Sequence, residues 1–223
     1  MKARQTGFTL VEIAIVLVII GLLLGGILKG QEMITQAKIK NVIADFSGVS
    51  AAYHGYQDRY RAIPGDDPNA ATRWAVAPAA TSGNGNGVVA GAYNSATATD
   101  ESRLWWDHLR RAGFVSGNGT LQPFNALTGQ IGVQTGDGQA AVGPTMLNAA
   151  GGNGFVGLIM CSANLPDKIA IAVDTQMDDG ASNLGTVRAL LQTAPNPAIG
   201  AAQVATAAYA ETSTNIYTLC RAL

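Results

Sequence analysis

A continuous apolar run near the N-terminus constrains this 223-residue chain more than any other feature. Residues 8–28 read FTLVEIAIVLVIIGLLLGGIL, and Glu12 is the one charged residue among them. As a helix rising about 1.5 Å per residue, this segment is about 31 Å long, which matches the hydrocarbon layer of a bilayer at roughly 30 Å. Lys2 and Arg4 precede it without an acidic residue, and such a basic stub usually stays in the cytoplasm. We therefore expect one membrane-spanning helix over residues 8–28, with the rest of the chain exported.

Two ordinary interpretations of this run explain Glu12 poorly. A secretory signal has a clean apolar region of about 7–15 residues before a small-residue cleavage site, which Gly25 and Gly26 could imitate. A plain membrane anchor would hold an unpaired carboxylate in lipid at a cost of about 2.5–3.5 kcal/mol. If the chain were cut after Gly7, the new amine on Phe8 could neutralise Glu12 of the same or a neighbouring subunit. The two costly charges would then offset each other within the bilayer.

The residues GFTLVE, from Gly7 to Glu12, stand between a short basic leader and a continuous apolar helix. This arrangement resembles the class III signal of type IV pilins and type II secretion pseudopilins. The resemblance implies a leader over residues 1–7, which a prepilin peptidase and methyltransferase removes between Gly7 and Phe8 before methylating the Phe8 amine. It also implies that Glu12 pairs with the amine of an adjacent subunit when the helix enters a filament.

The same resemblance implies partners and a location. The partners are homologous pilin subunits, the peptidase and an inner-membrane assembly platform. The protein would cross the bacterial inner membrane once with a cytoplasmic N-terminus, then join a periplasmic or extracellular filament. Many major pilins carry a proline where this chain has Lys29, so the helix interruption linked to that proline is not implied here. Gly21, Gly25 and Gly26 could loosen the helix instead.

Beyond residue 28 the apolar pattern becomes one-sided. Apolar and aromatic residues then recur every three or four positions, at Ile39, Val42, Ile43, Phe46, Val49, Tyr53, Tyr56 and Tyr60. No proline occurs before Pro64, where the sequence PGDDP gives a strong stop signal. We predict an amphipathic continuation over residues 29–60, with the tyrosines packed against a globular head.

Residues 61–223 form the predicted head, which is loop-rich because glycine, alanine, asparagine and threonine dominate it. Residues 101–112 predict a short helix that Gly113 closes, with Trp105 and Trp106 in the core. Strand candidates are residues 154–160, 168–173 and 216–220. A small antiparallel sheet on the long helix gives an α+β, pilin-like fold. The segments 63–70, 101–109 and 178–188 also resemble one group of pilin-like proteins, which favours a specialised or minor pilin.

The head contains the only two cysteines, Cys161 and Cys220. An even number of cysteines in an exported domain favours a disulfide, because the compartment is oxidising. The spacing is not that of a Cys-x-x-Cys redox motif, and two free thiols are the alternative.

Asp174, Asp178 and Asp179 bring three carboxylates close together in sequence, ahead of Gly180. Calcium prefers oxygen-rich loops, and some pseudopilins carry calcium in this part of the head. The spacing does not match an EF-hand loop, so we favour a solvated turn capped by aspartates and keep calcium as the alternative.

Composition excludes several other functions. Charged residues make up 13% of the chain, against about 25% in average domains, and the net charge is −1. Nucleic-acid binding is therefore not expected. His54 and His108 are the only histidines, without a metal-ligand spacing, and neither a Gly-x-Ser-x-Gly nor a phosphate-loop motif occurs. We expect a structural subunit rather than an enzyme, with no cofactor. There are two alternatives. One is a pseudopilin, and the other is a tethered binding module that does not polymerise, such as an adhesin or a DNA-uptake receptor.

Overall fold

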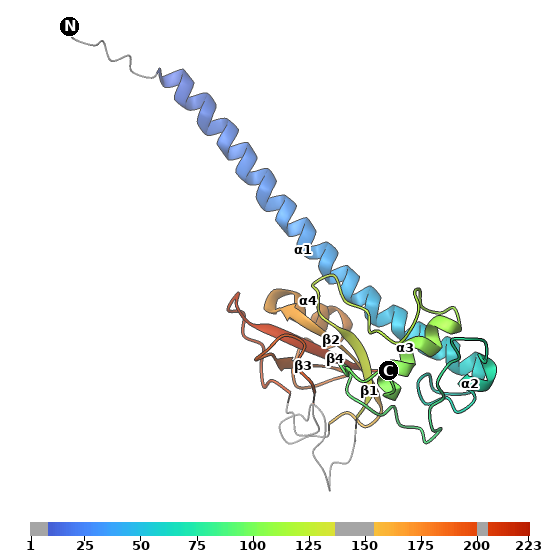
Figure 1. Ribbon diagram of the computed structural model, residues 1–223. Helices are drawn as coiled ribbons and strands as arrows, with labels where there is room; N and C mark the ends of the chain where they lie inside the picture. The colour runs from blue at the N-terminus through green and yellow to red at the C-terminus, as the bar shows by residue number, and fades with distance from the viewer. Residues whose placement is uncertain (1–8, 137–153, 200–204) are drawn as a thin grey trace. The chain divides into compact units, whose positions relative to one another are not determined.

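A long N-terminal helix and a four-stranded antiparallel sheet make up an α+β fold (Figure 1). The computed structural model describes residues 9–136, 154–199 and 205–223. Along the chain the elements are α1 (Leu10–Tyr60), α2 (Ala70–Arg73), α3 (Glu101–Arg111), β1 (Ile131–Thr135), β2 (Leu158–Pro166), α4 (Asp167–Met177), β3 (Val187–Leu191) and β4 (Ile216–Ala222). The expected pilin-like layout is confirmed. Two compact units divide the chain, one up to Lys38 and one from Ile39 to the C-terminus.

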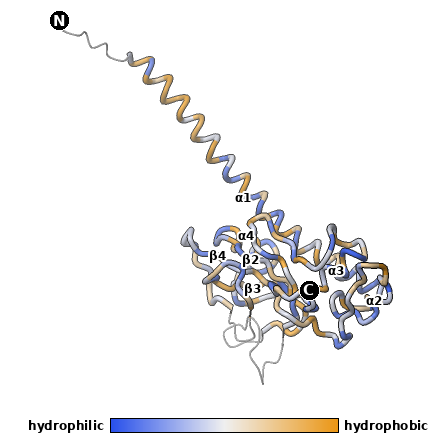
Figure 2. Tube along the Cα trace, viewed as in Figure 1, coloured by the Kyte–Doolittle hydropathy of each residue, from blue (hydrophilic) through white to orange (hydrophobic). Residues whose placement is uncertain are grey.

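Helix α1 is 51 residues long and changes character along its length. Up to Lys38 it has no buried side chain among its described residues, and apolar residues dominate its first half (Figure 2). From Ile39 its buried residues recur every three or four positions: Ile39, Val42, Phe46, Val49, Ala52 and Tyr56. This spacing places them on one face of a helix, and that face belongs to the main core of the head.

The sheet has the strand order β1-β2-β4-β3, and every neighbouring pair is antiparallel. Strand β2 lies second from the edge and is buried on both faces. Met160 faces the main core with α1, whereas Ile159 and Cys161 face a second, smaller core. The alternation follows from the two-residue period of a strand. A register shift between Ser162 and Leu165 interrupts the pairing of β2 with β4.

The predicted strand over residues 168–173 is wrong, because this segment lies in α4. Its alternating isoleucines and alanines suggested a strand, but the buried positions Ile169, Ala170, Val173 and Asp174 have helical spacing. The predicted strand over residues 154–160 is partly right, since β2 begins only at Leu158 and continues to Pro166. The strand over residues 216–220 is confirmed as part of β4. Strands β1 and β3 were not predicted.

Helix α3 confirms the predicted helix over residues 101–112 to within one residue. Trp105 and Trp106 are both almost fully buried, so the expected tryptophan anchor of the core is confirmed. Gly113 follows the helix with a φ of 81°, and its N–H donates to the carbonyl of Arg110 at 3.0 Å. A glycine in this left-handed conformation is a common helix terminator.

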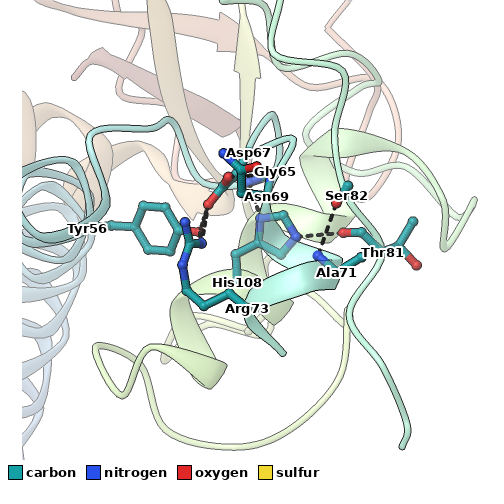
Figure 3. A network of polar contacts seen from close by, with 9 residues as sticks. All are labelled: Tyr56, Gly65, Asp67, Asn69, Ala71, Arg73, Thr81, Ser82 and His108. Carbon is teal, nitrogen blue, oxygen red and sulfur yellow. Dashed lines mark hydrogen bonds and ion pairs between the residues drawn. The ribbon is translucent and has the colours of Figure 1, made fainter. Parts of the chain in front are cut away.

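A buried polar network joins the end of α1 to the following loop (Figure 3). The Tyr56 hydroxyl donates to Asp67 Oδ2 at 2.6 Å, and Arg73 forms an ion pair with the same oxygen. Burial alone would raise the pKa of Asp67, but hydrogen bonds from Tyr56, Arg73 and the Asn69 N–H together outweigh it and lower the pKa. The Asp67 side chain is fully buried. The hydrogen bond from Tyr56 therefore joins this loop to α1, and the ion pair with Arg73 joins it to α2.

His108 of α3 links the same loop to a third segment (Figure 3). Its Nδ1 accepts the Gly65 N–H at 2.9 Å, and its Nε2 lies 2.8 Å from the Thr81 carbonyl. Gly65 has a φ of 82°, and a Cβ there would lie 2.3 Å from the Glu101 carbonyl oxygen. Only glycine therefore lets the chain pass this close to α3.

Candidate processing and assembly site

The predicted processing site precedes α1 in the sequence. Gly7 and Phe8 lie outside the described residues, so cleavage between them stays a prediction. The described chain begins at Thr9, and helix α1 begins one residue later. The first helical turn carries Glu12, the residue that sequence analysis assigned to assembly.

Thr9 and Glu12 form a reciprocal cap on the first turn of α1. The Thr9 hydroxyl and the Thr9 N–H both donate to Glu12 Oε2, at 2.7 and 2.8 Å, and the Glu12 N–H lies 3.3 Å from Thr9 Oγ1. This is the capping box of a Ser/Thr-x-x-Glu sequence, in which two orphan backbone donors are satisfied reciprocally. The capping role of Thr9 was not predicted from the sequence, although Thr-x-x-Glu before an apolar run is the known sequence pattern of a capping box.

The surface of α1 around Glu12 is apolar and exposed. Large hydrophobic side chains are exposed from Leu10 to Ile34, and Leu10 itself is 90% exposed. Helix α1 is long and apolar enough to cross a membrane, and no residue in its most apolar stretch is buried. Within the described residues Glu12 forms no ion pair, whereas Glu32 pairs with Lys29 at 2.7 Å. An uncovered apolar surface of this size needs lipid or other helices around it.

Comparison with known proteins identifies the motif itself. Residues 2–28 match the family model of the prokaryotic N-terminal methylation motif. No curated protein and no solved structure matches the chain. The chain therefore carries a class III prepilin-type signal, as type IV pilins and pseudopilins do. The motif supports a protein of the type IV pilin or pseudopilin type.

The predicted disulfide is present in the head. Cys161 of β2 and Cys220 of β4 are bonded and lie directly opposite each other in the antiparallel pairing. Both side chains are fully buried in the smaller core. The bond therefore ties the last strand to the middle of the sheet, as the sequence predicted.

The structure brings the three candidate calcium ligands together at the end of α4. One carboxylate oxygen from each of Asp174, Asp178 and Asp179 lies within 4.8 Å of the others. Asp178 Oδ2 accepts the N–H groups of Thr186 and Val187, and this anchors the turn before β3. Asp179 accepts the N–H of a residue two positions later, Ala181, at 2.8 Å. These bonds fit the capping role that the sequence favoured.

Asp174 differs from its two neighbours because it is fully buried. Its Oδ2 accepts the Tyr209 hydroxyl at 2.6 Å, whereas its Oδ1 is buried without a hydrogen-bond donor. Burial raises the pKa of Asp174, and the nearby charges of Asp179 and Asp178 raise it further. The carboxylate oxygens match the oxygen ligands that calcium prefers, so the residues fit the ion, and calcium stays the alternative to a turn capped by aspartates.

Proposed function

We propose that this protein is a structural subunit, of specialised or minor type, in a type IV pilus-like filament. A prepilin peptidase would cut between Gly7 and Phe8 and methylate the new amine. The mature subunit would then move from the inner membrane into the filament through α1. The match of residues 2–28 to the methylation motif supports a subunit of the pilin or pseudopilin type, and the exposed apolar surface of α1 fits such a subunit. The choice of a specialised or minor pilin rests on the resemblance of segments 63–70, 101–109 and 178–188 to one group of pilin-like proteins.

Glu12 would set the register between neighbouring subunits. Each incoming helix would bring its Phe8 amine to the carboxylate of an adjacent subunit, and this pair would replace part of the bonding that Thr9 supplies within the single chain. Most of the filament energy would come from apolar helix packing, because a buried ion pair specifies alignment more reliably than it adds net affinity. The head would face outward and determine what the filament contacts.

The test of assembly is the variant Glu12→Ala. We expect it to be processed but largely missing from filaments sheared off the cells, because subunits would lose the charge that positions them. Glu32→Ala is the matched control, since Glu32 is another exposed glutamate of α1 with a local partner in Lys29. Immunoblots of sheared and cell fractions would measure incorporation. Equal incorporation of wild-type protein and Glu12→Ala would contradict the register role.

The test of processing is Gly7→Ala. A Cβ at the cleavage position should leave most of the protein with its leader attached, which mass spectrometry of the N-terminus would detect. Gly30→Ala is the control, because a Cβ at Gly30 meets nothing within 4 Å in the chain. Mature Gly7→Ala protein that begins at Phe8 in wild-type amount would contradict the proposed site.

A pseudopilin of a type II secretion system is the second candidate, because the same motif begins both kinds of subunit. Deletion of the gene separates the two. Loss of a surface filament with normal protein secretion supports the pilin, and accumulation of folded cargo in the periplasm supports the pseudopilin. A tethered module that never polymerises would stay wholly in the membrane fraction.

A further inference from the structure

One end of the sheet contains a hollow of about 470 Å³. It is lined by Leu191, the last residue of β3, and by Ile216, the first residue of β4. Thr128 and Asn164 also line it. Small-molecule sites usually enclose about 300–1,000 Å³, so the hollow has the size of a ligand site.

The backbone around this hollow is unusually strained. The described residues contain five non-glycine residues with positive φ, and four of them lie in or beside the hollow. Thr128 (63°) and Asn164 (57°) line it, while Asn196 (47°) and Ser213 (64°) adjoin the lining residues Pro195 and Thr214. A threonine in this conformation is a true outlier, because its Cβ is branched. Strained residues that gather from separate segments are typical of ligand sites.

Side-chain amides hold these segments in place. Asn164 Oδ1 accepts the Asn196 N–H at 3.1 Å and the Gln192 amide at 3.3 Å. Gln192 Oε1 in turn accepts the Asn164 N–H at 3.0 Å, and Asn196 Oδ1 accepts the Gln130 N–H at 2.7 Å. The hollow is therefore pre-formed, which reduces the entropy that a ligand must overcome on binding.

The lining determines which ligands can bind. Its described side chains are amides, threonine hydroxyls and aliphatic groups, and none of them is ionisable. Leu191 and Ile216 are each about two-fifths exposed, at 41% and 43%. The lining offers an ion no counter-charge, which favours a neutral ligand over a charged one. Side-chain amides each carry two N–H donors, and those of Asn164 and Gln192 use one apiece in the bonds of 3.4 and 3.3 Å that they donate.

An extended peptide is a poorer fit than a compact polar molecule. A peptide commonly binds a sheet by adding a strand to a free edge. The outer edge of β3 is already occupied, because the Ala189 N–H donates to Ser182 and the Ala189 carbonyl accepts the Thr206 N–H, both at 2.8 Å. Leu191 N–H is also used, by the Thr206 hydroxyl.

We propose that this hollow binds a neutral saccharide of one or two units. Sugar hydroxyls would accept the remaining N–H groups of Asn164 and Gln192, and a C–H face of the ring would pack on Leu191 and Ile216. The recognition concerns the head alone, so it does not depend on whether the subunit enters a pilus or a pseudopilus.

Saturation-transfer NMR on the full chain tests the proposal. The protein is held in an amine-oxide detergent, because detergents with sugar headgroups would compete. The probes are lactose, cellobiose and N,N′-diacetylchitobiose, with glucuronic acid and an uncharged alanine–threonine peptide as comparators. We expect at least one neutral disaccharide to bind, and Ala194→Trp, which fills the hollow from its exposed rim, to weaken that binding at least about tenfold.

Ala98→Trp is the matched control, since Ala98 is exposed and lies outside the hollow. It should bind the sugar as the wild type does. Thr193→Trp fills the same hollow and serves as a second variant should Ala194→Trp lose its wild-type thermal melt. The proposal is overturned if no neutral sugar binds, or if only the peptide or glucuronic acid binds in the hollow. It is also overturned if the folded variant that fills the hollow, Ala194→Trp or Thr193→Trp, binds the sugar as well as Ala98→Trp does.

Discussion

His108 is buried in its neutral form. Its two ring bonds, one accepted from the Gly65 N–H and one donated to the Thr81 carbonyl, require a single proton on Nε2. Burial lowers the pKa of His108 below its usual 6.5, against the opposing influences of the Thr81 carbonyl, Asp67 and Asp107. A second proton would remove the acceptor at Nδ1 and leave a buried charge beside the Gly65 N–H.

We therefore predict that acid destabilises the head through His108. Below pH 6.5 the unfolded chain binds a proton that the folded chain resists, so stability falls with pH by up to about 1.4 kcal/mol per unit. Above that pH the contribution is fully present. Urea denaturation between about pH 5 and 7.5 measures it. His108→Gln should be less stable and less pH-dependent in this range, whereas His54→Gln, at an exposed histidine of α1, should keep the wild-type slope. Parallel slopes for all three proteins would contradict the prediction.

A metal ion held by the three aspartates would lie at the connection from α4 to β3. Asp174 is the last buried residue of α4, and Asp178 holds the start of β3 through Thr186 and Val187. One carboxylate oxygen of Asp174 lies within 4.8 Å of carboxylate oxygens of Asp178 and Asp179. A cation there would join the helix end to the strand and relieve the repulsion among three negative charges.

The calcium alternative predicts a metal-dependent gain in stability at this connection. Addition of calcium to chelator-treated protein should raise the melting temperature, because a ligand at 100 times its Kd stabilises the folded state by about 2.7 kcal/mol. Asp174→Asn should abolish the shift, and Asp58→Asn, at an exposed position of α1, should retain it. Calorimetry that gives neither heat nor a change in melting temperature would show that the three aspartates only cap the turn.

The elements that could be predicted from sequence are those whose pattern is long or sharply bounded. Helix α1 has 51 residues of apolar character without proline, and α3 is closed by Gly113. Strand β2 was predicted only in part, because it is covered on both faces and lacks the half-buried alternation that marks a strand. Helix α4 was taken for a strand, since Ile169 and Ile171 alternate with alanines within a short run.

The functional sites also differ in how far the sequence alone could predict them. Glu12 and the cysteines stood out because each is rare in its surroundings. The hollow at Asn164 could not be predicted, because its walls come from segments that are far apart in sequence and meet only through the sheet. The nearness of Asp174, Asp178 and Asp179 in sequence was visible, but the hydrogen bond that Asp174 accepts comes from Tyr209, 35 residues away.

At the scale of the whole molecule, the chain separates into an apolar unit that ends at Lys38 and a compact unit from Ile39, which contains the second part of α1 and the head. The described part of the first unit has no buried residue, whereas the core of the second begins at Ile39. Val42 and Phe46 are fully buried in that core. The head should therefore need the second part of α1 for its stability, and it should not need the first.

Two truncations test this division. A chain that begins at Thr35 keeps one helical turn before Ile39, so we expect it to be soluble without detergent and to melt close to the full-length protein. A chain that begins at Ser47 loses Ile39, Val42 and Phe46, and deletion of each buried side chain of this size costs about 2–5 kcal/mol. That total exceeds the stability of most domains, so the shorter chain should not fold. Near-ultraviolet circular dichroism and size-exclusion chromatography distinguish the two. Equal stability of both chains would mean that the head does not need Ile39, Val42 and Phe46, and that the rest of the core holds it together.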